Sequence, residues 1–156
     1  MAGATPRWIG TTASRYRPAM TIPLWCLLGF VVWTLLLLLA VAAVRIGAVL
    51  GGRKKANEFT SGVPHGGDAY WRLNRAHLNC LENLPIFATV VLVATVAGIR
   101  AAMLDTLART YLAARVGQTI AHVSAGSVLA VNVRFGFFVV QVACVIGFLM
   151  TIWRAG

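Results

Sequence analysis

The sequence predicts an all-α membrane protein, built as one four-transmembrane-helix bundle. Of its 156 residues, 59% are hydrophobic and only 12% are charged, which is too apolar for an ordinary soluble domain. Charge-free runs that suit a bilayer cover residues 24–44, 84–99 and 135–153. A soluble bundle is disfavoured, because so short a chain has too little polar surface to cover four apolar helices.

The first helix is expected at residues 22–50, where two glycines would end it. Residues 1–20 form a polar, basic N-terminal segment in front of a helical domain at residues 21–156. The segment could begin a signal peptide, but the apolar run after it exceeds the roughly 7–15 residues of a signal core. A second interpretation is that translation begins at Met20, which would leave this segment untranslated.

The second helix is expected at residues 71–98, after a stretch rich in Gly, Asn, Ser and Pro that is typical of a loop. Tyr70 and Trp71 suit an aromatic anchor at the membrane interface. Pro85 lacks a backbone N–H and should kink this helix.

The third helix, at residues 103–124, is the weakest candidate for a membrane span. Three charged side chains interrupt it, namely Asp105, Arg109 and Arg115. The fourth helix is expected at residues 134–154, after a short connection at residues 125–132. Gln141 is the only strongly polar side chain within its apolar run.

Charge and cysteine usage exclude two classes of partner. The net charge of +10 would suggest nucleic acid in a soluble protein, but the basic residues lie mostly at helix ends and in loops. Membrane lipids are therefore the expected partner, and nucleic acid is not. The cysteines Cys26, Cys80 and Cys144 are far apart and form no CxxC pair, so neither a metal site nor a disulfide framework is predicted.

The most informative residues are Arg75, Asn79 and Glu82, at the head of the second apolar helix. Their spacing of i, i+4 and i+7 puts them on one narrow helical face. Ionisable groups at the edge of a membrane-embedded segment are costly and mark a functional site by default. The alternative is a structural Arg–Glu bridge that ties helices together.

A second polar face is predicted on the third helix, where Tyr111, Arg115, Gln118 and His122 share one side. The arginines near these two faces outnumber the one nearby carboxylate, Glu82. A surplus of semi-buried arginine favours an external anion. A small molecule with carboxylates and one amine fits this mixture of side chains.

The segment R-A-H-L-N-C-L-E-N-L-P-I-F, at residues 75–87, closely resembles the second-helix signature of the MAPEG family, the membrane-associated proteins in eicosanoid and glutathione metabolism. It is nearest to the microsomal glutathione transferase branch. Supporting segments are R-K-K-A-N at residues 53–57, A-R-V-G-Q-T-I-A-H at residues 114–122 and V-N-V-R-F-G-F-F around Arg134. The resemblance spans residues 21–153.

This resemblance implies a homotrimer that binds glutathione between neighbouring subunits. The positions that match the family's glutathione contacts are Arg53, Arg75, His77, Asn79, Glu82, Asn83, Gln118 and His122. Glu82 would face the γ-glutamyl ammonium, and Arg134 matches the arginine that stabilises the glutathione thiolate. Gln118 and His122 stand where several family members carry tyrosines.

The resulting interpretation is an integral, multi-pass membrane glutathione transferase with glutathione-dependent peroxidase activity as a further possibility. Glutathione would be its co-substrate, no metal would take part, and an apolar electrophile or a lipid hydroperoxide would arrive from the bilayer. In a bacterium this would be the inner membrane. Two other hypotheses stay open: a non-catalytic scaffold of the same family that binds lipid or glutathione, and a small transporter or structural bundle.

Overall fold

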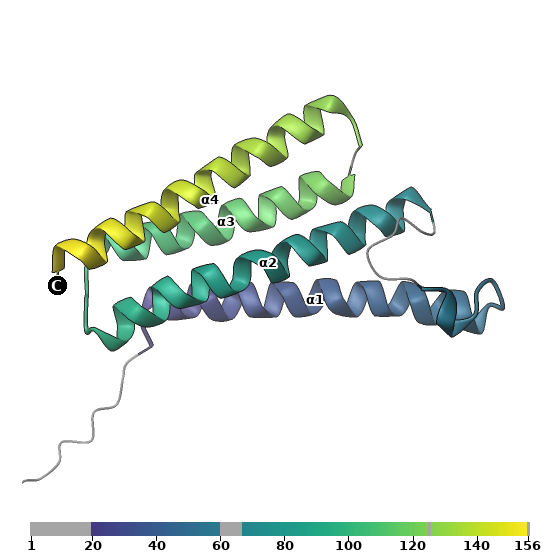
Figure 1. The fold of residues 1–156 in the computed structure, drawn as a ribbon, viewed down its shortest axis with the longest axis horizontal. Helices are drawn as coiled ribbons and strands as arrows, with labels where there is room; N and C mark the ends of the chain where they lie inside the picture. Colours follow the sequence, from purple (N-terminus) through teal and green to yellow (C-terminus); the bar gives the residue numbers. More distant parts are fainter. Residues whose placement is uncertain (1–19, 60–66, 125, 156) are drawn as a thin grey trace, which may run out of the picture.

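The computed structural model describes residues 20–59, 67–124 and 126–155, and they form a bundle of antiparallel helices (Figure 1). Its elements are α1 (Ile22–Leu50), the 3-10 turn η1 (Ala56–Glu58), α2 (Asp68–Val96), α3 (Ala102–Ser124) and α4 (Val128–Ala155). The α1–α2 and α3–α4 connections lie at one end of the bundle, here called the α1–α2 end. The α2–α3 connection, the start of α1 and the last turn of α4 lie at the other, the α2–α3 end. The expected all-α fold with four helices is confirmed.

Two helices begin earlier than the sequence suggests. α2 begins at Asp68 rather than at residue 71, because an acidic side chain in the first turn interacts favourably with the helix dipole. α4 begins at Val128, before the start at Arg134 that the sequence predicts. The Ser127 hydroxyl accepts a hydrogen bond from the Ala130 N–H at 3.3 Å, which caps the helix and moves its start back. α2 stays helical through Pro85.

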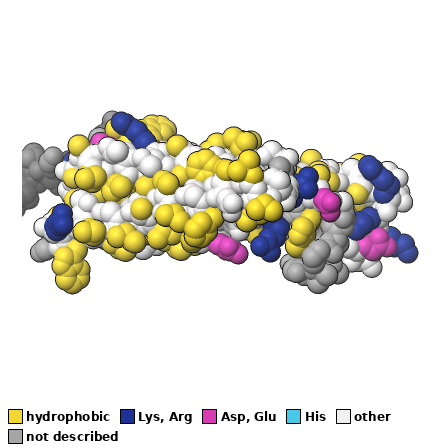
Figure 2. All heavy atoms as spheres, turned by 90° about the horizontal axis from the view of Figure 1, so that it is seen from above, with side chains coloured by type: hydrophobic (Ala, Val, Ile, Leu, Met, Phe, Trp, Pro, Cys, Tyr) yellow, Lys and Arg dark blue, Asp and Glu magenta, His cyan; other side chains and the backbone are white. Residues whose placement is uncertain are grey.

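Over the described residues, three helices are long and apolar enough to cross a membrane: α1, α2 and α4. α3 is not among them, which agrees with the charged side chains that interrupt it. Of the four expected membrane spans, three are therefore supported. Many large apolar side chains point outward, for example Leu28, Leu35 and Leu39 on α1. Figure 2 shows apolar side chains over most of the bundle, whereas most Lys and Arg on this face lie toward the α1–α2 end, at the right of the view. Such an apolar exterior suits contact with lipid tails.

An aromatic core aligns the four helices. Each helix contributes one buried ring to this core: Phe30 from α1, Phe87 from α2, Tyr111 from α3 and Phe148 from α4. Phe87 stacks on Tyr111 with ring centroids 4.1 Å apart and an interplanar angle of 2°. Phe30 and Phe148 pack against Phe87 at 6.3 and 6.0 Å. Because this core fixes how the helices are rotated, it decides which polar side chains meet beyond it.

The α3–α4 pair depends on glycine at its contact points. A Cβ at Gly117 would lie 2.7 Å from Cζ of Phe137, so any side chain there must displace the ring. We expect Gly117→Val to lower the thermal stability of the detergent-solubilised protein, because overpacking costs about 1–3 kcal/mol. The matched control is Gly136→Val on the same helix pair, since a Cβ at Gly136 meets nothing within 4 Å. Equal melting temperatures for the two variants would contradict this close packing.

Candidate functional site

A buried arginine occupies the centre of the polar face of α3. Arg115 lies one turn after the core residue Tyr111 and is only 1% exposed. Its Nη1 donates to Oε1 of Gln118 at 2.8 Å and to the backbone oxygen of Asn79 at 3.4 Å. Its guanidinium carbon lies 5.5 Å from the ring centroid of Phe30. Arg115 thereby connects α1, α2 and α3.

Two donors of Arg115 remain available. Nε and Nη2 are buried, and neither makes a hydrogen bond of ordinary length to a described residue, although the Cys80 thiol and the Tyr111 hydroxyl lie close to the guanidinium. Unpaired buried donors on a charged group cost free energy, so an acceptor placed here would be bound favourably. A carboxylate suits a guanidinium best, because its two oxygens match the guanidinium fork.

Gln118 joins this arginine to α4. Its Nε2 donates to the backbone oxygen of Arg134 at 3.0 Å, and its Oε1 also accepts from Nε2 of Gln141 at 3.1 Å. Gln141 is 1% exposed, and its Oε1 has no partner among the described residues. Gln118 is therefore committed to holding α3 and α4 together around Arg115.

The third polar side chain of α3, His122, bonds an arginine near the start of α4. Nη1 of Arg134 bonds Nδ1 of His122. A guanidinium only donates hydrogen bonds, so Nδ1 is the acceptor and the imidazole proton sits on Nε2. That Nε2 is also buried and has no partner in the described structure. His122 therefore adds a third unpaired donor to the two of Arg115.

Two arginines of α2 approach the same place. Nε of Arg72 donates to the backbone oxygen of Val123 at 3.3 Å, where α3 ends. The charges of Arg75 and Arg72 act on His122 together with that of Arg134, so all three guanidinium groups lie near it. We call Arg72, Arg75, Arg115 and Arg134 the arginine cluster. It gathers four positive charges toward the α1–α2 end of the bundle.

The structure leaves Arg53 and Glu82 outside this cluster. Both are exposed, and no ion pair joins either of them to another residue within the described ranges. Arg75 is exposed as well, so the described chain offers no Arg75–Glu82 bridge. The structural-bridge alternative therefore finds no support within a single chain.

His77 and Asn83 also lie apart from the cluster. His77 is buried, 7% exposed, on the side of α2 where the charge of Arg45 reaches it. The side chain of Asn83 folds onto its own helix, where Nδ2 donates to the backbone oxygen of Asn79 at 2.8 Å. Of the predicted contacts, the single chain brings together Arg75, Gln118, His122 and Arg134, with Asn79 joined through its backbone.

Sequence reasoning missed part of this arrangement. Arg115 is visible in the sequence as part of a polar face, but no rule of spacing shows that it is the most buried charged side chain of the described chain. Gln141 carries a clear signal, because it is the only strongly polar residue in its apolar run. A polar side chain in such a run is rarely placed without a partner.

The cluster suits an anion rather than a metal. Guanidinium groups carry no free acceptor and do not ligate metal ions. The described residues contain no group of three His, Cys, Asp or Glu side chains that could hold a metal. Cys26, Cys80 and Cys144 are free and buried within the helices.

The MAPEG family model matches residues 22–153, which include α1, α2, α3, all but the last turn of α4 and every residue of the arginine cluster. No curated protein matches the chain.

Proposed function

This chain belongs to the MAPEG family, and from that premise we propose that it is a membrane glutathione transferase. Glutathione would bind at the arginine cluster as the co-substrate, and its thiolate would attack an apolar electrophile or reduce a lipid hydroperoxide. The observation that carries this proposal is the excess of arginine around unpaired buried donors. Glutathione supplies two carboxylates for these donors and one ammonium for a glutamate.

The thiol of glutathione needs a cation near its sulfur. The thiolate is the nucleophile, and ordinary thiols have a pKa of about 8.5, so little thiolate exists at neutral pH. Arg134 cannot accept a proton, but its fixed positive charge favours the ionised sulfur. The sulfur then forms a bond to the electrophilic carbon as the leaving group departs with the bonding electron pair. With a hydroperoxide, the sulfur instead takes the terminal oxygen, and a second glutathione completes the reduction to disulfide, alcohol and water.

A second copy of the chain would complete the site. Glu82 lies near the middle of α2, a helix able to span the membrane, yet its carboxylate is exposed and unpaired in the described chain. Leaving this charge against lipid would cost several kcal/mol, on the order of 3 for an acidic residue at a helix centre. We propose that the copies form a homotrimer, in which Glu82, Asn79 and Arg53 of one chain face the arginine cluster of the next.

One observation favours the non-catalytic alternative. Gln118 and His122 stand where several relatives carry tyrosines, and both use their side chains within the chain, Gln118 on Arg115 and His122 on Arg134. Their hydrogen bonds could position a bound glutathione without activating its sulfur. Binding and thiol activation must therefore be measured separately.

The test is a titration of the purified, detergent-solubilised protein with glutathione at pH 7. We expect a saturable rise in absorbance at about 240 nm, where the thiolate absorbs, and saturable heat in calorimetry at the same concentrations. S-methylglutathione is the matched control, because it should bind but cannot form a thiolate. Heat without absorbance would identify a glutathione-binding scaffold. The absence of both signals would contradict the proposal altogether.

A further inference from the structure

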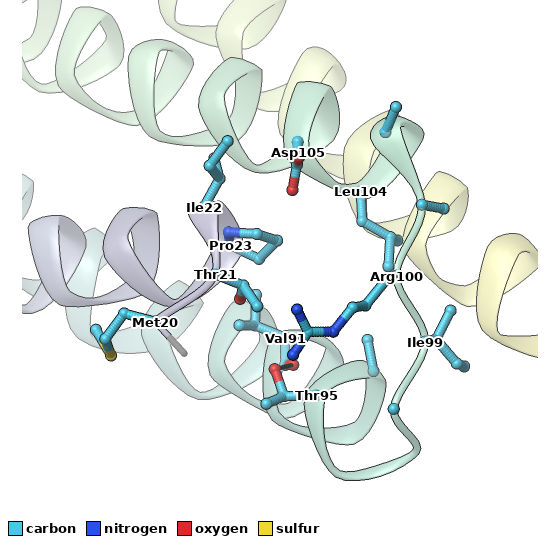
Figure 3. Close-up of a pocket in the computed structure, with 14 residues that line it drawn as sticks. Met20, Thr21, Ile22, Pro23, Val91, Thr95, Ile99, Arg100, Leu104 and Asp105 are labelled. Atoms are coloured by element: carbon cyan, nitrogen blue, oxygen red, sulfur yellow. Dashed lines mark hydrogen bonds between the residues drawn. The ribbon is translucent and has the colours of Figure 1, made fainter. Parts of the chain in front are cut away.

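A cavity lies at the α2–α3 end of the bundle, at the opposite end from the arginine cluster. It has a volume of about 440 Å³, within the usual range of small-molecule sites. Its walls come from the start of α1, the end of α2, the α2–α3 connection and the start of α3 (Figure 3). Because α1 and α2, whose ends form two of these walls, can cross a membrane, the cavity sits at the level of the lipid head groups.

The cavity has an apolar floor. Pro23 of α1, Val91 and Ala94 of α2, and Leu104 of α3 line it, and all four are buried. Thr21 and Thr95 add hydroxyl groups at its side. The hydroxyl of Thr95 donates to the backbone oxygen of Val91 at 2.7 Å, so its oxygen can still accept a hydrogen bond.

One cation and one anion face this floor without pairing. Arg100 reaches in from the α2–α3 connection, over Val91 and toward Thr95, while Asp105 enters from α3 on the other side (Figure 3). They are the only charged side chains among the described residues that line the cavity. No hydrogen bond or ion pair joins either side chain to another residue of the described chain. The cavity therefore offers separated positive and negative groups to one ligand.

We propose that this cavity binds a lipid-type head group that carries a phosphate and a primary ammonium. The phosphate would lie on Arg100, whose guanidinium matches two phosphate oxygens. The ammonium would lie on Asp105, on the opposite side of the cavity from Arg100. The apolar floor would take the glycerol backbone and the first methylene groups of the acyl chains.

The lining also argues against a choline head group. A quaternary ammonium has no N–H to donate and is usually held by aromatic rings. Within the part of the chain that the structure describes, no residue that lines the cavity is aromatic. The primary ammonium of a phosphoethanolamine therefore fits this cavity better than choline does, and the proposal is independent of the function assigned to the arginine cluster.

The test uses the full chain in detergent micelles, with native mass spectrometry to count bound lipids. The protein is titrated with phosphatidylethanolamine and with phosphatidylcholine of the same acyl chains. We expect tighter binding of phosphatidylethanolamine by roughly fivefold, the upper range for a solvent-accessible ion pair. Equal affinities for the two lipids would overturn the proposal.

Two variants separate the roles of the charges. Arg100→Gln should weaken the binding of both lipids by roughly fivefold, because both carry the phosphate. Asp105→Asn should remove only the preference for phosphatidylethanolamine. The controls are Arg154→Gln, an exposed arginine in the last turn of α4 that does not line the cavity, and Asp68→Asn at the start of α2. Effects of the controls as large as those of the variants would overturn the proposal.

A competition experiment identifies the source of the head group. Soluble O-phosphoethanolamine is added in excess to the complex with phosphatidylethanolamine. Displacement of the lipid would show that the charged groups alone suffice and that a soluble phosphoethanolamine is also a ligand. Retention of the lipid would show that the acyl chains contribute to binding and that the ligand is a bilayer lipid.

Discussion

Replacement of Glu82 by alanine is expected to abolish measurable glutathione binding. The proposed site pairs this carboxylate with the ammonium of glutathione, and truncating one partner of a desolvated charge pair costs about 2–5 kcal/mol. The dissociation constant should therefore rise by roughly 30-fold or more. Calorimetry on the detergent-solubilised variant measures the change directly. Glu82→Gln, which keeps the shape of the side chain and removes its charge, should weaken glutathione binding nearly as much.

Because Glu82 is exposed in the single chain and bonded to no described residue, its loss should leave the fold intact. The trimer should also survive, as checked by its mass in detergent. Asp68→Asn is the matched control, since Asp68 lies on the same helix about four turns away and should leave glutathione binding unchanged. Unchanged affinity in Glu82→Ala would show that the ammonium binds elsewhere.

Arg134→Ala is expected to leave glutathione bound, but with a thiol pKa in its ordinary range. A guanidinium close to a titrating group typically shifts its pKa by about 1–3 units. Without it, the thiol pKa of bound glutathione should rise, so at pH 7 the thiolate fraction should fall about tenfold for each unit. The measurement is the absorbance at about 240 nm as a function of pH, at a glutathione concentration that saturates the variant. The wild-type signal should persist to a lower pH than that of the variant.

Arg134→Lys should retain part of the thiolate signal, because it keeps a positive charge but loses the fork that holds His122. Arg154→Ala changes the same helix at its other end and should behave as the wild type. If Arg134→Ala loses binding and thiolate absorbance to the same degree, Arg134 is a binding residue and the thiolate is stabilised by another group. Arg115, with two unpaired buried nitrogens, would then be the next residue to replace.

The fold is largely readable from the sequence because it depends on local properties. Long apolar runs predict helices α1, α2 and α4, and their interruption by charges predicts that α3 is the weakest span. The start of α4 is less readable, because it depends on a single capping hydroxyl, that of Ser127, in a stretch without a hydrophobic signal for its boundary.

The candidate site is readable only in part. Periodicity correctly groups Arg115, Gln118 and His122 on one face of α3, and the structure joins them to Asn79 and Arg134. It also groups Arg75 and Glu82 on one face of α2, and both side chains are exposed, but only Arg75 lies near the arginine cluster of the described chain. His77, only two residues from Arg75, turns toward the side of Arg45 instead.

By itself, then, the sequence determined the four helices, the membership in the MAPEG family and the residues that share each helical face. Only the tertiary structure decided that Arg115 is buried with two free donors while Glu82 stays exposed. The physical reason is that a repeat of about 3.6 residues fixes directions around one helix but not the rotation of that helix against its neighbours. That rotation is set by the packing of Phe30, Phe87, Tyr111 and Phe148, residues far apart in the chain whose contact no local pattern encodes.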